Sequence, residues 1–187
     1  MRAACLKGIE FADSITFDPH KTLVPIGSGS CGIFLTPHRS AVEKAFNIRG
    51  QPVRTHDDEY MSLQGSRTTS GLHVLVIFLQ PERLRRQVET AAHLGDFLRE
   101  QLKQAGWEIA NDTSLPVVCA LHPKIRQGKM TAAEAGCYLA KKGVLAKAEA
   151  LRPDEPASIR PGVISRRTNE ATIRQVVDHL REFVTTK

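Results

Sequence analysis

The stretch that decides the fold is residues 12–23, ADSITFDPHKTL. Its β-branched and aromatic part, residues 14–17, predicts a short strand, and Pro19 ends that strand because proline cannot donate a ladder hydrogen bond. His20 and Lys21 follow just beyond the strand end, ahead of a glycine-bearing turn at residues 25–30. In open α/β sheets, ligand-binding groups gather at this position. Composition alone leaves the alternative of a solvated surface lysine, because most lysines are exposed.

Working outward from this stretch, a second apolar strand is predicted at residues 31–36, closed by Pro37. A hydroxyl-rich lead-in at residues 65–71 opens an apolar run at 72–79, whose periodicity does not distinguish strand from helix and which Pro81 interrupts. A long helix follows, because small or apolar residues recur at steps of three and four and form one stripe. The stripe consists of Leu84, Val88, Ala91, Gly95, Leu98 and Leu102.

Gly106 ends the long helix, and the sequence after it predicts short alternating strands and helices. We expect a small ββαββα layer over residues 107–187. A helix starts at Thr131, where Thr131 and Glu134 have the spacing of a capping box, and Gly143 is its stop. Strands are predicted at residues 107–110, 115–121, 144–150 and 159–165. The last helix begins near Thr168 and carries on one face the apolar residues Ile173, Val176, Val177, Leu180 and Val184.

Composition excludes several classes of protein. The 187 residues are 41% hydrophobic and 25% charged, which is enough for one large or two small domains and excludes a disordered tail. The net charge is +6, but acidic residues are interspersed among the basic ones, and aromatic residues make up only 5% of the chain. Both features disfavour nucleic-acid binding. The cysteines and histidines lack metal-ligand spacing, and no apolar run has the length of a signal peptide or membrane span. We therefore expect a cytoplasmic protein without a metal, a nucleic-acid partner or a membrane partner.

Residues 12–23 resemble the lysine motif of the group II pyridoxal-phosphate-dependent amino-acid decarboxylases, including the Asp-Pro-His-Lys core at residues 18–21. The resemblance continues through residues 31–36, through the Gly-Ser-Arg segment at 65–67 and through the C-terminal layer. It implies an α/β fold, namely the C-terminal part of a fold-type I, aspartate aminotransferase-like subunit that binds pyridoxal phosphate (PLP). Residues 1–86 would be a remnant of the large PLP-binding domain, and residues 87–187 the linking helix and the small α+β C-terminal domain.

The resemblance also implies the residues of a cofactor site. Lys21 would form the internal Schiff base with PLP, and His20 would act as a second catalytic group near the phosphate and the substrate. Asp18, Gly65 and Ser66 would lie around the phosphate, which backbone amides at a helix start can bind. Structural roles remain the alternative: His20 could bond a carbonyl, Asp18 could belong to a strand-ending turn, and Ser66 could cap a loop.

The resemblance implies one substrate-binding residue, Arg160, because an arginine of the family's C-terminal strand can grip the substrate carboxylate with its planar guanidinium. A structural role for Arg160 is the alternative.

The family carries much of its cofactor site upstream of the lysine, whereas only twenty residues precede Lys21. We therefore expect the C-terminal part of a homodimeric amino-acid decarboxylase that needs an upstream half, as an extension or as a second chain. The alternatives are a PLP-dependent lyase of the same fold and a non-catalytic α/β module that binds a partner protein.

Overall fold

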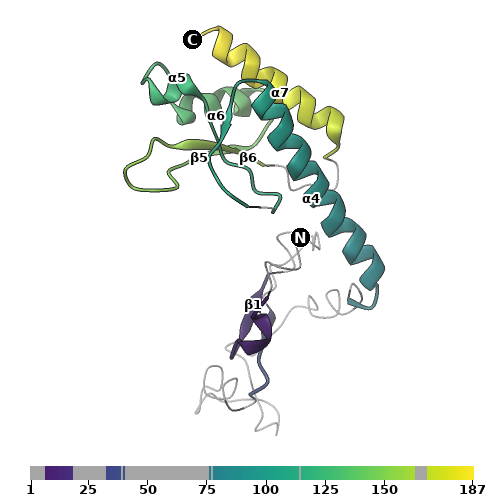
Figure 1. Cartoon of the computed structure of the whole chain (residues 1–187). Coiled ribbons are helices and arrows are strands. Elements are labelled where there is room, and N and C mark those ends of the chain that lie inside the picture. The colour runs from purple at the N-terminus through teal and green to yellow at the C-terminus, as the bar shows by residue number, and fades with distance from the viewer. Residues whose placement is uncertain are drawn as a thin grey trace, which may run out of the picture. The chain divides into compact units, whose positions relative to one another are not determined.

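The computed structural model describes residues 7–18, 33–38, 40, 76, 78–113, 115–162 and 168–187 (Figure 1). The chain divides into two compact units, residues 1–84 and residues 85–187. Helix α4 (Pro81–Gln104) runs across the division.

The first unit contains a short helical turn and two paired strands. The turn η2 (Ile9–Phe11) precedes strand β1 (Ile15–Phe17), which pairs antiparallel with β2 (Ile33–Leu35). In this register, Ile15 lies opposite Leu35 and Phe17 lies opposite Ile33. Both strands were predicted from the sequence and are confirmed, each slightly shorter than expected.

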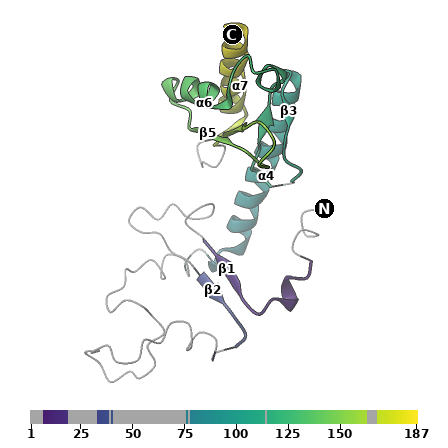
Figure 2. The ribbon, with the colours of Figure 1, turned by 90° about the vertical axis from the view of Figure 1, so that its left-hand side faces the viewer.

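The second unit is a four-stranded antiparallel sheet with helices packed on it (Figures 1 and 2). The strands lie in the order β3-β4-β6-β5. Their bounds are β3 (Glu108–Ile109), β4 (Ala120–Leu121), β5 (Ala146–Glu149) and β6 (Ser158–Pro161). The helices after α4 are α5 (Pro123–Arg126), α6 (Ala132–Lys141) and α7 (Glu170–Thr185). The predicted ββαββα layer is confirmed, with the four-residue helix α5 as an addition.

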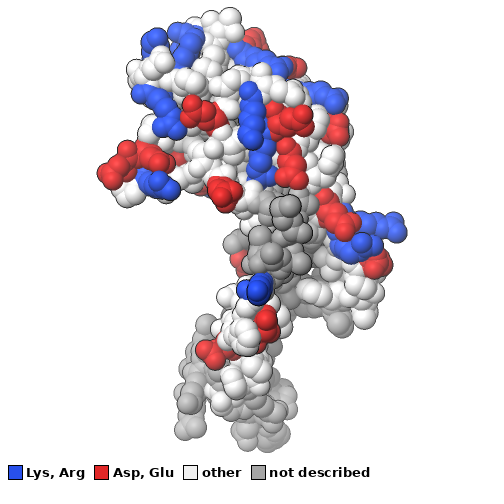
Figure 3. All heavy atoms as spheres, in the orientation of Figure 1, with Lys and Arg blue, Asp and Glu red and all other residues white. Residues whose placement is uncertain are grey.

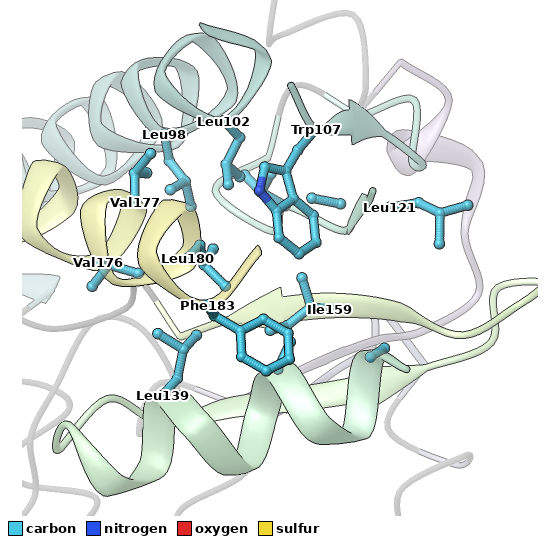
Figure 4. Packing of buried hydrophobic residues seen from close by; sticks show 14 of the residues in the cluster. Leu98, Leu102, Trp107, Leu121, Leu139, Ile159, Val176, Val177, Leu180 and Phe183 are labelled. Atoms are coloured by element: carbon cyan, nitrogen blue, oxygen red, sulfur yellow. The ribbon is translucent and has the colours of Figure 1, made fainter. Parts of the chain in front are cut away.

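One hydrophobic core holds the second unit together. It joins side chains that are at most 1% exposed from four elements (Figure 4). They are Leu98 and Leu102 of α4, Leu139 of α6, Ile159 of β6 and Leu180 of α7. Burying a leucine or isoleucine side chain stabilises a fold by about 1.5–3 kcal/mol, so these few residues account for much of the driving force.

Helices α4 and α7 lie side by side, as both ribbon views show (Figures 1 and 2). His93 Nε2 of α4 is 3.2 Å from Glu170 Oε1 of α7, and the Arg174 guanidinium of α7 lies over the Phe97 ring, 5.1 Å from its centroid. These contacts are exposed and each adds little to stability. They therefore orient two helices that the core already holds.

Helix α4 starts at Pro81, a position where the missing N–H of proline has no helical partner to lose. As expected, the element before Pro81 ends ahead of it, since Leu79 and Gln80 are not helical. The predicted apolar stripe of α4 is buried only towards its C-terminal end: Val88 is 50% exposed, and the buried residues begin at Ala92. On α7, four of the five residues of the predicted apolar face are buried, Val184 is partly buried, and Phe183 is buried in addition.

The strand predicted at residues 115–121 was also too long, because only Ala120 and Leu121 are in strand β4. Side chains take the hydrogen bonds of the preceding backbone. The Arg99 guanidinium of α4 donates to the carbonyls of Leu115 and Val117, and Asn111 donates to the Val117 carbonyl and accepts from the Cys119 amide at 2.8 Å each. A backbone whose polar groups are partnered in this way needs no neighbouring strand.

The start of α6 has the predicted capping box. Thr131 Oγ1 accepts from the Glu134 amide at 3.1 Å, and Glu134 accepts from the Thr131 amide at 2.7 Å. Lys187 Nζ donates to the same carboxylate at 2.7 Å. The hydrogen bond from Lys187, followed by the bonds from Thr131, lowers the pKa of Glu134 from 4.5 to about 2.

This carboxylate predicts an acid-sensitive contribution to stability. Because the folded-state pKa of Glu134 lies below its unfolded value of 4.5, the contribution is present above pH 4.5 and is lost as the pH falls towards 2. We expect the midpoint of thermal unfolding of Glu134→Gln to lie below that of the unaltered chain at pH 7, with a difference that shrinks below pH 4. Circular dichroism between pH 7 and 2.5 measures this difference. The substitution Lys187→Met removes a hydrogen bond to Glu134 and should reduce this difference as well. A difference that stays constant with pH would contradict the acid-sensitive contribution of Glu134.

Candidate functional site

Strand β1 leads directly into the motif that carries the proposed chemistry. Asp18, the residue after β1, is half-buried. At the other end of the strand pair, Thr36 Oγ1 donates to the Asp13 carbonyl at 2.8 Å and accepts from the His38 amide at 3.1 Å. The Phe17 ring meets the Phe78 ring edge to face, with centroids 6.1 Å apart. Hydrogen bonds therefore tie one end of the pair, and Lys21 belongs in the sequence to the connection between the two strands.

Most of the expected site lies outside the described residues. This holds for Lys21 and His20, and also for Gly65 and Ser66 of the Gly-Ser-Arg segment. Lys21 follows the last residue of β1 by four positions along the chain. Its role and theirs stay predictions from the sequence.

Arg160 is described, and it lies in β6 next to the buried Ile159. Neighbouring residues of a strand point to opposite faces, so Arg160 lies on the face away from the core. Its guanidinium forms an ion pair with Glu149 of β5, with Nη2 2.9 Å from Oε1, and the two side chains are 33% and 39% exposed. We did not single out Glu149 from the sequence, although the alternation of Lys147 and Glu149 along β5 places two charges on that face.

A buried thiol lies near this ion pair. Cys119 is 2% exposed, and burial raises the pKa of its thiol above the usual value, while a hydrogen bond with Ser158 acts in the opposite direction. Ser158 is also buried and donates its hydroxyl to the Glu149 carbonyl at 3.0 Å. A buried thiol with a raised pKa stays protonated and unreactive. We therefore assign Cys119 and Ser158 to the packing beneath Arg160 and Glu149.

The described histidines near the core have structural partners. His122 Nδ1 accepts from the Lys124 amide at 3.2 Å and so caps α5, and its ring packs against the buried Trp107. Burial, followed by the nearby Lys124 ammonium, lowers the pKa of His122. His122 is therefore neutral at physiological pH, as its cap contact requires.

Within the described part of the chain, no group of three or more His, Cys, Asp or Glu side chains is placed to hold a metal ion. In the same residues, no helix combines the length and the apolar character needed to cross a membrane. On the face of the second unit seen in Figure 3, Lys and Arg alternate with Asp and Glu and form no patch of a single sign.

Neither protein-family models nor curated proteins match this sequence. Solved structures do match its fold. Tryptophan decarboxylase from Catharanthus roseus in complex with L-tryptophan has a TM-score of 0.75 at 18% identity, and the match covers 97% of this chain and 38% of that chain. Mouse CSAD in apo form has a TM-score of 0.71 at 20% identity, covering 96% of this chain and 41% of that chain. For 4-hydroxyphenylacetaldehyde synthase from Rhodiola rosea, the TM-score is 0.75 at 16% identity, with coverage of 97% and 38%.

The fold is therefore the mixed α/β fold of the C-terminal portion of PLP-dependent decarboxylases, a partial fold-type I structure. This confirms the expected fold class. The chain spans about two fifths of the length of these neighbours, as the coverage of 38–41% shows. At identities of 16–20%, the likeness concerns the fold alone.

The predicted donor set fits PLP chemically. An amine is available for the aldehyde at Lys21, and a hydroxyl with backbone amides is available for the phosphate at Gly65 and Ser66. The described part contributes the strand pair that ends at Asp18. An acidic partner for the pyridine nitrogen is absent from the predicted set, so the fit covers only part of the cofactor.

Proposed function

We propose that this chain is the C-terminal part of a PLP-dependent amino-acid decarboxylase. The observation that carries the proposal is a coincidence of two independent features. The fold matches decarboxylase structures over 96–97% of the chain, and the Asp-Pro-His-Lys motif follows directly after β1 in the sequence. One feature concerns the backbone and the other concerns side-chain chemistry, and both lead to the same class of enzyme.

Lys21 holds the cofactor in this proposal. Its amine would hold PLP as a Schiff base, which requires the unprotonated amine and therefore desolvation or a nearby positive charge. When bound, PLP supplies the electron sink for the carbanion that remains after loss of the substrate carboxylate. No other side chain of this motif can form that bond to the aldehyde.

The remaining motif residues bind and orient. His20 lies beside the lysine in the sequence and is suited to proton transfer or to an anion contact. Asp18, Gly65 and Ser66 lie around the phosphate in this proposal, and the backbone amides at Gly65 and Ser66 bind it. Arg160 binds the carboxylate of the amino-acid substrate with the N–H donors that Glu149 leaves free.

A second polypeptide segment completes the proposed enzyme. The structural neighbours are more than twice as long as this chain, and in the resembling family the groups that stack on the cofactor ring and pair with its nitrogen lie upstream of the lysine. We propose that an upstream half supplies them, either within one polypeptide or as a separate chain, and that the assembled enzyme is a homodimer.

A related PLP-dependent activity on the same fold is the second candidate. The observation that favours it is the match to 4-hydroxyphenylacetaldehyde synthase, whose TM-score equals that of the tryptophan decarboxylase. Identification of the product separates the two candidates: an amine with carbon dioxide indicates a simple decarboxylase, whereas an aldehyde indicates the related activity. A non-catalytic module would yield neither product.

Borohydride reduction of the assembled protein with PLP tests the role of Lys21. We expect reduction to leave the cofactor covalently attached to Lys21, because borohydride converts a Schiff base into a stable secondary amine. Peptide mass spectrometry locates the label. Lys21→Ala is the matched control and should lose the label, and predominant labelling of a different lysine in the unaltered protein would overturn the assignment.

A further inference from the structure

Three charged side chains lie on one face of the β5–β6 hairpin. The register places Lys147 opposite Arg160 and Glu149 opposite Ser158. Ile159, between Ser158 and Arg160, is fully buried in the core. The three charges therefore lie on the face away from the helices, because side chains alternate along a strand and opposite residues share a face.

Glu149 holds Arg160 through one edge of its guanidinium. The contact is an ion pair in which Nη2 lies 2.9 Å from Oε1. Within the described residues, Glu149 is the ion-pair partner of Arg160, and a third of the arginine side chain stays exposed. A guanidinium has five N–H donors in a rigid fork, so it can hold Glu149 and still donate to a second carboxylate.

The ion pair between Arg160 and Glu149 also determines the net charge of this face. Lys147 and Arg160 are like charges placed directly opposite each other, an arrangement that is unfavourable without a counter-charge. Glu149 supplies that counter-charge and leaves one net positive charge among the three side chains. One carboxylate bound at Arg160 balances this net charge, so a second carboxylate placed beside Glu149 gains no net attraction from the group.

We propose that Glu149 is a positioning residue that orients Arg160 and restricts this carboxylate site to ligands with a single negative charge. The inference rests on the proposed role of Arg160 and deepens it: the substrate would be an amino acid with an uncharged side chain. Glu149 then determines specificity without touching the reacting atoms.

Protection of Arg160 from phenylglyoxal tests the inference without cofactor or turnover. Phenylglyoxal modifies guanidinium groups, and peptide mass spectrometry gives the rate at Arg160 in the full 187-residue chain. Acetate and glutarate serve as probes with one and two carboxylates, at constant ionic strength because salt screens exposed charges. Arg126, which pairs with Glu108 at 3.0 Å, is the internal control in the same digest.

In the unaltered chain, we expect glutarate to protect Arg160 no better than acetate does. In Glu149→Gln, the half-protecting concentration of glutarate should fall about tenfold, and that of acetate by a smaller factor, because a negative charge has been removed beside the site. Arg126 should respond alike in both proteins. Stronger protection by glutarate than by acetate in the unaltered chain, or no change in Glu149→Gln with an unaltered circular dichroism spectrum, would overturn the inference. Labelling at Lys21 is independent of this result, so the inference and the proposed function can fail separately.

Discussion

Replacing Lys21 by alanine in the assembled enzyme is expected to lower the decarboxylation rate at least a thousandfold. Such a loss corresponds to about 4 kcal/mol of transition-state stabilisation. The reason is that the variant can hold the cofactor only through non-covalent contacts and offers no amine for exchange with the substrate. Release of carbon dioxide from a labelled amino acid, measured under single-turnover and steady-state conditions, determines the loss.

Two controls define what this result means. Lys7→Ala changes an exposed lysine of the same unit and should retain full activity. The 187-residue chain alone, with saturating PLP, should show no enzymatic rate, because it lacks the proposed acidic partner of the pyridine nitrogen. Activity of the chain alone would refute the need for an upstream half, and activity of Lys21→Ala in the assembled enzyme would refute the role of the lysine.

Gly95→Ala is expected to destabilise the second unit by about 1–3 kcal/mol. A Cβ atom at Gly95 would lie 2.8 Å from Pro116 Cα and 3.3 Å from Pro116 Cβ, so the backbone next to α4 would have to move. That backbone is also held by Arg99, whose guanidinium donates to the carbonyls of Leu115 and Val117. The cost of this movement exceeds the gain of about 0.5–1 kcal/mol that alanine brings to a helix interior.

The matched control is the same substitution at Gly136 of α6. A Cβ atom there would meet only the Ala146 carbonyl oxygen, at 3.8 Å, which is an ordinary contact. Gly136→Ala should therefore stabilise the chain by about 0.5–1 kcal/mol. Urea unfolding followed by circular dichroism gives both free energies of unfolding. If the two substitutions had the same sign, the close approach of Pro116 to α4 would not constrain the fold.

The candidate site shows where sequence reasoning was strong and where it stopped. The strand that precedes the Asp-Pro-His-Lys motif was predicted correctly, because β-branched residues followed by proline are a local signal. The roles of Lys21 and His20 depend on the resemblance to a family. A lysine that follows a strand does not by itself indicate a particular reaction or cofactor. Glu149 was missed because its importance comes from Arg160, eleven residues away along the chain.

By itself, the sequence determined the elements whose hydrogen bonds and periodicity are local. The capping box of Thr131 and Glu134 and the apolar face of α7 formed as predicted, because helical contacts join residues three and four positions apart. Gly106 ends α4 with a φ of 81°, a conformation that glycine adopts without steric cost.

Only the tertiary structure decided which of the available groups found distant partners. The stripe of α4 has the same pattern at Val88 as at Leu98, yet only Leu98 lies against the rest of the second unit and is buried. The backbone at residues 115–119 had strand propensity, but Arg99 and Asn111 bond the Leu115 and Val117 carbonyls and the Cys119 amide. The physical reason is the same in both cases. Burial and long-range hydrogen bonding depend on which distant residues pack against a residue, and the local periodicity of the sequence does not identify those residues.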